Sequence, residues 1–109
     1  MSEERVQSYR AAERRLWEHY GVSPQEQFLE LARPKVKVRL QEIGAGPPVL
    51  FVHGGPNAGS TWAPLVAGLQ DFRCLVLDRP GCGLSEAVDY AAYSARDVPS
   101  LAADILAST

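Results

Sequence analysis

The chain has 109 residues, of which 46% are hydrophobic and 22% charged, and its formal net charge is −2. This is ordinary globular composition with room for one domain. The near-neutral charge without a basic run argues against a surface for nucleic acid or for an anionic membrane. No apolar stretch approaches the ~18 residues of a spanning helix. The N-terminus lacks the pattern of a secretory signal, and Cys74 and Cys82 are too few for a disulfide scaffold, which predicts a cytoplasmic protein with reduced thiols.

Residues 1–25 are predicted to form a helical extension. Apolar and aromatic side chains recur there at helical spacing between Glu and Arg residues: Val6, Tyr9, Leu16, Trp17 and Tyr20. Gly21 is a suitable helix stop. We expect this amphipathic helix to pack on its own domain, with partner binding as the alternative.

Two structures compete for residues 26–32. Ser23-Pro24-Gln25-Glu26 has the form of a capping box, which favours a helix through Leu31. After a break at residues 32–35, apolar and polar residues alternate up to Gln41, which predicts a strand whose polar side chains, Arg39 and Gln41 included, face the solvent.

Residues 49–78 predict a unit of two parallel strands joined by a helix. Val49–Val52 and Cys74–Leu77 are apolar throughout, as strands covered on both faces must be. Between them, Ser60 can cap a helix with one apolar face made of Trp62, Leu65, Val66 and Leu69. In such a sheet the functional loops follow the carboxyl ends of the strands, which here are the Gly-rich loops His53–Gly59 and Asp78–Ser85.

The first loop also has the spacing of a phosphate-binding loop. The run from Gly54 to Thr61 reads GGPNAGST, so Ser60 stands where that motif needs Lys to neutralise phosphate charge. Pro56 removes one of the backbone N–H groups that such a loop points at phosphate. A nucleotide site is therefore disfavoured.

Both loops together resemble the α/β-hydrolase family. The strand and loop from Val49 to Pro56 resemble that family's third strand and its His-Gly-x-Pro oxyanion loop. The segment from Asp78 to Ser85, DRPGCGLS, resembles its Asp-x-x-Gly-x-Gly-x-Ser segment after the fourth strand. The resemblance implies an α/β fold: an antiparallel hairpin over 27–31 and 36–43, parallel strands with a crossover helix, then another helix, within a hydrolase domain spanning residues 26–109.

The resemblance assigns Gly55 one backbone N–H of an oxyanion hole, which stabilises the negative oxygen formed by attack on a carbonyl. His53, Gly54 and Pro56 would shape this loop, and a general-base role for His53 is disfavoured. Trp62 would line a substrate pocket or pack its helix on the sheet, and packing is the favoured alternative.

In the second loop, the Asp78 carboxylate would hold the Gly81–Gly83 turn through backbone N–H groups, with Ser85 completing the motif. Arg79 would pair with Asp78 or be a solvated charge. Cys82 lacks the strand–turn–helix setting of a nucleophile, so a plain thiol is expected.

The resemblance places the nucleophile, acid and catalytic His after this chain's last helix, which is predicted from Asp97 with Val98, Leu101, Ala102 and Ile105 on one face. Ser85 is the nearest match to a nucleophile elbow but follows a loop, not a strand. We therefore expect the N-terminal portion of a hydrolase of small ester-like or epoxide substrates, needing no cofactor or metal and inactive by itself. A non-catalytic binding module is the alternative. With two parallel strands and an apolar edge at Val49–Val52, the chain is expected to be poorly folded or to aggregate.

Overall fold

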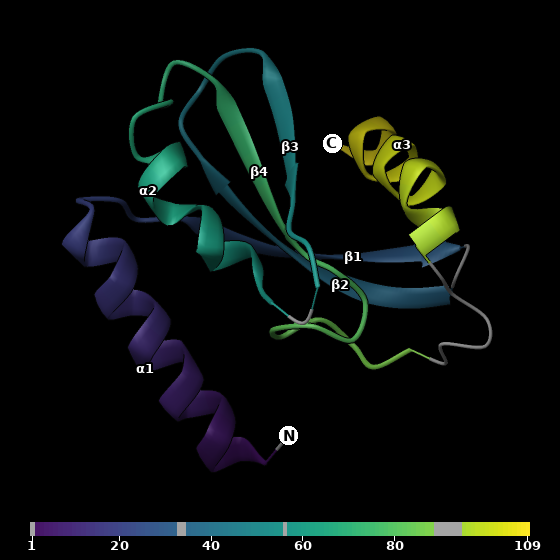
Figure 1. The fold of residues 1–109 in the computed structure, drawn as a ribbon, viewed down its shortest axis with the longest axis horizontal. Helices are drawn as coiled ribbons and strands as arrows, with labels where there is room; N and C mark the ends of the chain where they lie inside the picture. The colour runs from purple at the N-terminus through teal and green to yellow at the C-terminus, as the bar shows by residue number, and fades with distance from the viewer. Residues whose placement is uncertain (1, 33–34, 56, 89–94) are drawn as a thin grey trace.

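The computed structural model describes residues 2–32, 35–55, 57–88 and 95–109. Its centre is a four-stranded sheet in the order β1-β2-β4-β3, with helices on both faces (Figure 1). Arg33 and Pro34 of the predicted break, Pro56, and Tyr90 and Tyr93 of the predicted connection lie outside the described residues.

The antiparallel hairpin is confirmed, and the capping-box helix is wrong. β1 (Gln25–Ala32) and β2 (Lys35–Ile43) pair from Gln25 opposite Glu42 to Ala32 opposite Lys35. A capping box stabilises a helix only by local hydrogen bonds, whereas here an unbroken ladder with β2 holds the same residues. Tertiary pairing therefore overrides the local preference.

The parallel unit is confirmed as well. β3 (Pro48–Val52) runs parallel to β4 (Arg73–Asp78), which is almost wholly buried between β3 and β2. The crossover is short, a 3₁₀ turn η1 (Gly59–Trp62) followed by α2 (Ala63–Val66). The predicted helix face is wrong at Leu65, which is 49% exposed, because only a single turn of α-helix forms.

Two apolar clusters occupy the two faces of the sheet. On one face, α3 (Val98–Ser108) buries Leu101 and Ile105 against β2 and β4, as its spacing predicts. On the other face, α2 and α1 (Glu3–His19) bury Val66 and Trp17. Helices therefore cover both faces of the described sheet. The small number of parallel strands had led us to expect that the faces would be poorly covered.

The predicted apolar stripe of α1 is right in part: Trp17 is 2% exposed, and Val6 and Tyr9 are half-buried. Its two buried residues are Glu13 and Trp17, whereas Leu16 and Tyr20 are each 36% exposed. This explains a second error: Arg39 and Gln41, predicted to face solvent, are 3% and 4% exposed. α1 covers that face of β2 and meets it with a carboxylate.

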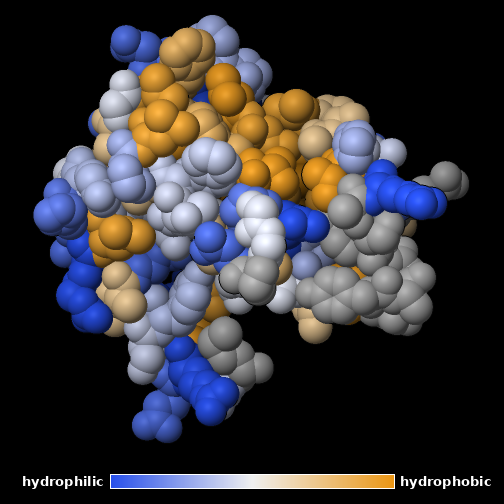
Figure 2. Space-filling model, viewed as in Figure 1, coloured by the Kyte–Doolittle hydropathy of each residue, from blue (hydrophilic) through white to orange (hydrophobic). Residues whose placement is uncertain are grey.

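β3 is the outer strand of the described sheet, with half-buried apolar side chains. Hydrophobic surface gathers over the half of the molecule that contains β3 and α3, and hydrophilic surface over α1 (Figure 2). Such an edge can pair with another chain, so we predict concentration-dependent association, measured by light scattering. Scattering independent of concentration would contradict this prediction.

None of the helices within the described ranges is long and apolar enough to span a membrane.

Candidate functional site

The first Gly-rich loop leaves the sheet at the carboxyl end of β3. Its first residue, His53, is 2% exposed, and its ring Nε2 accepts a hydrogen bond from the Arg79 N–H at 3.0 Å. Burial lowers the pKa of His53 and outweighs the opposing influence of the Gly54 carbonyl and Asp78. A neutral imidazole fits the acceptor role of Nε2, so His53 links this loop to the loop after β4.

Gly55 adopts a left-handed backbone conformation at φ 52°. A Cβ at this position would meet no atom within 4 Å, so the space beside its Cα is open. Its carbonyl accepts from the Asn57 N–H at 3.0 Å, and its own N–H has no acceptor among the described residues. The backbone thus presents a free donor next to open space, in a conformation that glycine adopts without strain.

One buried carboxylate joins the two loops. Asp78, 1% exposed, accepts through Oδ1 from the Gly59 N–H at 2.7 Å and through Oδ2 from the Leu84 N–H at 3.1 Å. Asp78 therefore does hold the loop after β4, but through Leu84 instead of the Gly81–Gly83 turn. Charge-assisted bonds to backbone N–H groups are among the stronger hydrogen bonds in proteins.

Gly59 and Gly83, the two glycines next to this carboxylate, leave no room for a side chain. A Cβ on Gly59 would lie 2.6 Å from Val76 Cγ1 and 2.8 Å from the Leu77 carbonyl oxygen. A Cβ on Gly83 would collide with the Asp78 carboxylate, and Gly83 also has φ 54°. Gly81, at φ 81°, donates its N–H to the Glu86 carbonyl at 2.8 Å and closes the turn.

Ser85 lies between β2 and the end of β4. Its Oγ accepts from the Arg39 N–H at 2.8 Å and donates to the Asp78 carbonyl at 2.5 Å. Both bonds are to backbone groups, so this hydroxyl ties the loop to the sheet. Cys82 is a free, half-buried thiol.

Arg79 does not pair with Asp78, contrary to one of the two predictions for it. Its guanidinium Nη1 lies 3.5 Å from the His53 carbonyl oxygen. Asp78 instead forms an ion pair with Arg39, with 3.3 Å between Asp78 Oδ2 and Arg39 Nη1. Trp62 is half buried, and its ring centroid is 5.6 Å from that of Phe51, which fits the packing alternative.

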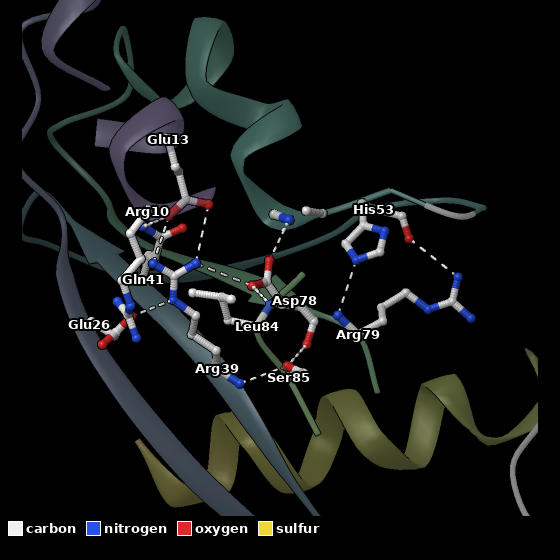
Figure 3. A network of polar contacts seen from close by, with 12 residues as sticks. Arg10, Glu13, Glu26, Arg39, Gln41, His53, Asp78, Arg79, Leu84 and Ser85 are labelled. Atoms are coloured by element: carbon white, nitrogen blue, oxygen red, sulfur yellow. Dashed lines mark hydrogen bonds and ion pairs between the residues drawn. The ribbon is translucent and has the colours of Figure 1, made fainter. Parts of the chain in front are cut away.

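The largest polar feature escaped prediction. Arg39 donates from Nη2 and Nη1 to the two oxygens of Glu13 at 2.6 and 3.2 Å, and from Nε to Glu26 at 2.6 Å (Figure 3). Gln41 donates to Glu13 at 3.2 Å, and Arg10 to Glu26 at 2.7 Å. Two signals were present in the sequence: Glu13 lies one helical turn before Trp17, and Arg39 comes opposite Asp78 once β2 pairs with β4.

The charged side chains in this network shift one another's pKa values. Burial opposes the charged form of Arg39, but the carboxylates of Glu13, Asp78 and Glu26 outweigh it and raise the pKa of Arg39. Burial also disfavours the Glu26 carboxylate, yet Arg10 and Arg39 outweigh it and lower the pKa of Glu26. A carboxyl with a lowered folded-state pKa contributes stability above its unfolded pKa and loses it as pH falls through the folded pKa.

The phenol of Tyr9 is expected to titrate at unusually high pH because of this network. Burial, followed by the charges of Asp78 and Glu13, raises the pKa of Tyr9 to about 12. The raised pKa stabilises the fold fully below the unfolded pKa, about 10, and this stabilisation is lost as pH rises to about 12. We expect absorbance titration to show a phenolate phase centred near 12 that Tyr9→Phe removes. The same late phase in Tyr9→Phe, or its absence in both chains, would contradict the expectation.

The described residues contain no cluster of three or more His, Cys, Asp or Glu side chains that could hold a metal ion. The Gly55 N–H, without an acceptor in the described part of the chain, lies between His53, which accepts from Arg79, and Gly59, which donates to Asp78.

Known proteins are similar to this chain in sequence. A cis-3-alkyl-4-alkyloxetan-2-one decarboxylase from Xanthomonas campestris pv. campestris is 47% identical over 60 residues, which is 52% of this chain and 20% of the relative. A haloalkane dehalogenase 2 from Mycobacterium tuberculosis is 37% identical over 51 residues, 46% of this chain and 18% of the relative. The chain thus spans about a fifth of the length of these curated relatives.

Solved structures agree with the fold. The chain superposes on E-2-(acetamidomethylene)succinate hydrolase with a TM-score of 0.69 and 26% identity, covering 79% of this chain and 31% of that one. An epoxide hydrolase from Vigna radiata gives a TM-score of 0.55 and 29% identity, covering 61% and 20%. The sequence profile of the alpha/beta hydrolase fold matches residues 47–108, more than half of the chain, and the chain therefore belongs to the alpha/beta hydrolase family.

Proposed function

We propose that this chain supplies the oxyanion loop of an α/β-fold hydrolase, with the Gly55 N–H as the donor. The observation that supports this most is the free N–H of Gly55 beside open space, in a loop that follows the carboxyl end of β3. A fixed donor of this kind stabilises charge that develops on a substrate oxygen.

In the reaction we propose, a nucleophile attacks an ester-like carbonyl carbon, and the electron pair of the C=O bond moves to its oxygen. The Gly55 N–H donates to that oxyanion. Collapse of the tetrahedral intermediate expels the alcohol, and water then releases the acyl group. We assign no nucleophile, acid or catalytic His within these 109 residues, so the proposed contribution is the oxyanion loop alone.

The other motif residues act on geometry in this proposal. His53 and Gly54 shape the loop before the donor, while Asp78 fixes its far end at Gly59. Among the remaining motif positions, Gly83 and Ser85 keep the neighbouring loop close to Asp78. Preorganisation of this kind holds the donor ready before charge develops.

The substrate class is proposed from the relatives described above, whose names refer to small molecules. The ring named in the Xanthomonas enzyme, an oxetan-2-one, is a four-membered cyclic ester, and other relatives are named for haloalkanes and epoxides. We propose a small ester-like, epoxide or related electrophile. Trp62, which packs against Phe51, would line the substrate pocket with the part of its ring that Phe51 does not cover.

A graft tests this function. Residues 47–108 replace the corresponding segment of the Xanthomonas relative, and turnover of that enzyme's own substrate is measured. We expect the graft to be active and Gly55→Pro, which removes the N–H and also cannot keep φ 52°, to lower kcat by at least about 10²–10³. Gly68→Ala is the control, because Gly68 lies outside this loop and its Cβ would make only an ordinary contact, 3.7 Å from the Leu65 carbonyl oxygen. An inactive graft that still folds would favour the non-catalytic alternative.

A further inference from the structure

A continuous line of polar contacts runs from α1 to the oxyanion loop (Figure 3). Glu13 of α1 receives two hydrogen bonds from Arg39 of β2, at 2.6 and 3.2 Å. The same guanidinium reaches Asp78 Oδ2 at 3.3 Å, and Asp78 Oδ1 accepts from the Gly59 N–H at 2.7 Å. Three side chains therefore connect the N-terminal helix to the residue that ends the loop carrying Gly55.

Each of the three side chains is almost inaccessible to water. The exposed fractions of the Glu13, Arg39 and Asp78 side chains are 5%, 4% and 1%. At such low exposure these charges are weakly screened by water, so we expect the removal of one charge to disturb its neighbours. We therefore expect a change at Glu13 to reach Asp78 through Arg39.

The geometry at Asp78 determines what that rearrangement does. Its Oδ2 already serves both Arg39 and Leu84, while Oδ1 serves Gly59. If Glu13 no longer holds Arg39, the guanidinium has Asp78 and Glu26 as its remaining carboxylates. Closer approach of Arg39 to Asp78 would turn the carboxylate away from the Gly59 N–H and loosen the end of the loop.

We propose that α1 is a positioning element for the oxyanion loop and that Glu13 is its positioning residue, acting through Arg39 and Asp78. The catalytic consequence of this positioning rests on the proposed function of Gly55. The physical coupling from Glu13 to Gly59 does not, and it is measured without any turnover. Failure of one therefore remains distinguishable from failure of the other.

A role limited to anchoring α1 makes a different prediction. Loss of an anchor lowers the free energy of global unfolding, and amides that exchange only through global unfolding then accelerate together. Loss of positioning accelerates exchange at Gly59 and Leu84 more than at the centre of β4. Leu75, fully buried in β4, is the reference amide.

The experiment is amide hydrogen exchange, followed by NMR, on the full 109-residue chain at low concentration. Glu13→Gln is compared with Glu18→Gln, which makes the same charge change at an exposed residue of the same helix. For Glu13→Gln we expect exchange at Gly59 and Leu84 to accelerate about 10-fold relative to Leu75, with the Gly59 amide proton moving upfield as its short bond to carboxylate weakens. Glu18→Gln should leave both ratios unchanged.

If Glu13→Gln does not fold, Glu13→Asp takes its place, because it keeps the charge and withdraws the carboxylate by one methylene. The same preferential acceleration is then expected, to a smaller extent. Exchange at Gly59 that stays unchanged, or that accelerates only in step with Leu75, would overturn the proposal.

Discussion

Arg39→Met is expected to lower the free energy of unfolding by about 3–5 kcal/mol. The side chain is 4% exposed and is the direct positive partner of Glu13 and Asp78. Methionine fills a similar volume but leaves two buried carboxylates without a countercharge, and the desolvation of unpaired charge is the main cost. Urea denaturation at low chain concentration measures the change.

The matched control is Arg73→Met. Arg73 makes an ion pair of the same length, 2.6 Å to Glu42, but its side chain is 30% exposed. Water screens this pair, so a loss of at most about 1 kcal/mol is expected. The double variant Arg39→Met with Glu13→Met should recover part of the loss, because it removes one of the stranded charges. Equal effects at Arg39 and Arg73 would contradict the assignment of a buried network.

Gly83→Ala is expected to lower the free energy of unfolding by about 2–5 kcal/mol. One part is backbone strain, since alanine at φ 54° costs about 1–2 kcal/mol. The other is overpacking: the new Cβ would collide with the Asp78 carboxylate, a cost of about 1–3 kcal/mol. Thermal or urea unfolding measures the total.

Gly55→Ala separates these two contributions. Gly55 has nearly the same backbone conformation, at φ 52°, but a Cβ there meets no atom within 4 Å. It should therefore show the strain alone, about 1–2 kcal/mol. If Gly83→Ala costs no more than Gly55→Ala, the close approach of the loop to Asp78 is wrong.

Sequence periodicity predicted the strands because each strand's environment leaves a local pattern. The alternation that starts at Lys35 identified β2, and the apolar run Cys74–Leu77 identified a strand with both faces covered. Parallel pairing then placed the loops after β3 and β4 at one edge of the sheet, where the structure has them joined through His53 and Asp78.

The polar face of β2 could not be predicted in the same way. Alternation shows only that Arg39 lies on the face opposite Val38, and not what covers that face. The cover is α1, which meets the sheet through the carboxylate of Glu13. Among the apolar residues of α1, Trp17 is buried but Leu16 and Tyr20 are exposed, because the helix contacts the sheet through the Glu13 carboxylate as well as through Trp17.

Within the site, chemistry was easier to predict than partners. The carboxylate at the end of β4 was expected to hold backbone N–H groups, and it does so at Gly59 and Leu84. Which N–H groups it reaches depends on the close approach of Gly59 to β4. That approach follows from the crossover geometry and is not written in the motif.

The most direct measurement of the central claim removes one hydrogen-bond donor, the Gly55 N–H, from the loop. In the active graft, the Gly55 amide is replaced by an ester through glycolic acid, which deletes the N–H while leaving the side chain and the backbone path unchanged. We predict that kcat falls about 10²–10³-fold relative to the same replacement at Gly54. Equal kcat values for the two ester variants would contradict the assignment of Gly55 as the oxyanion donor.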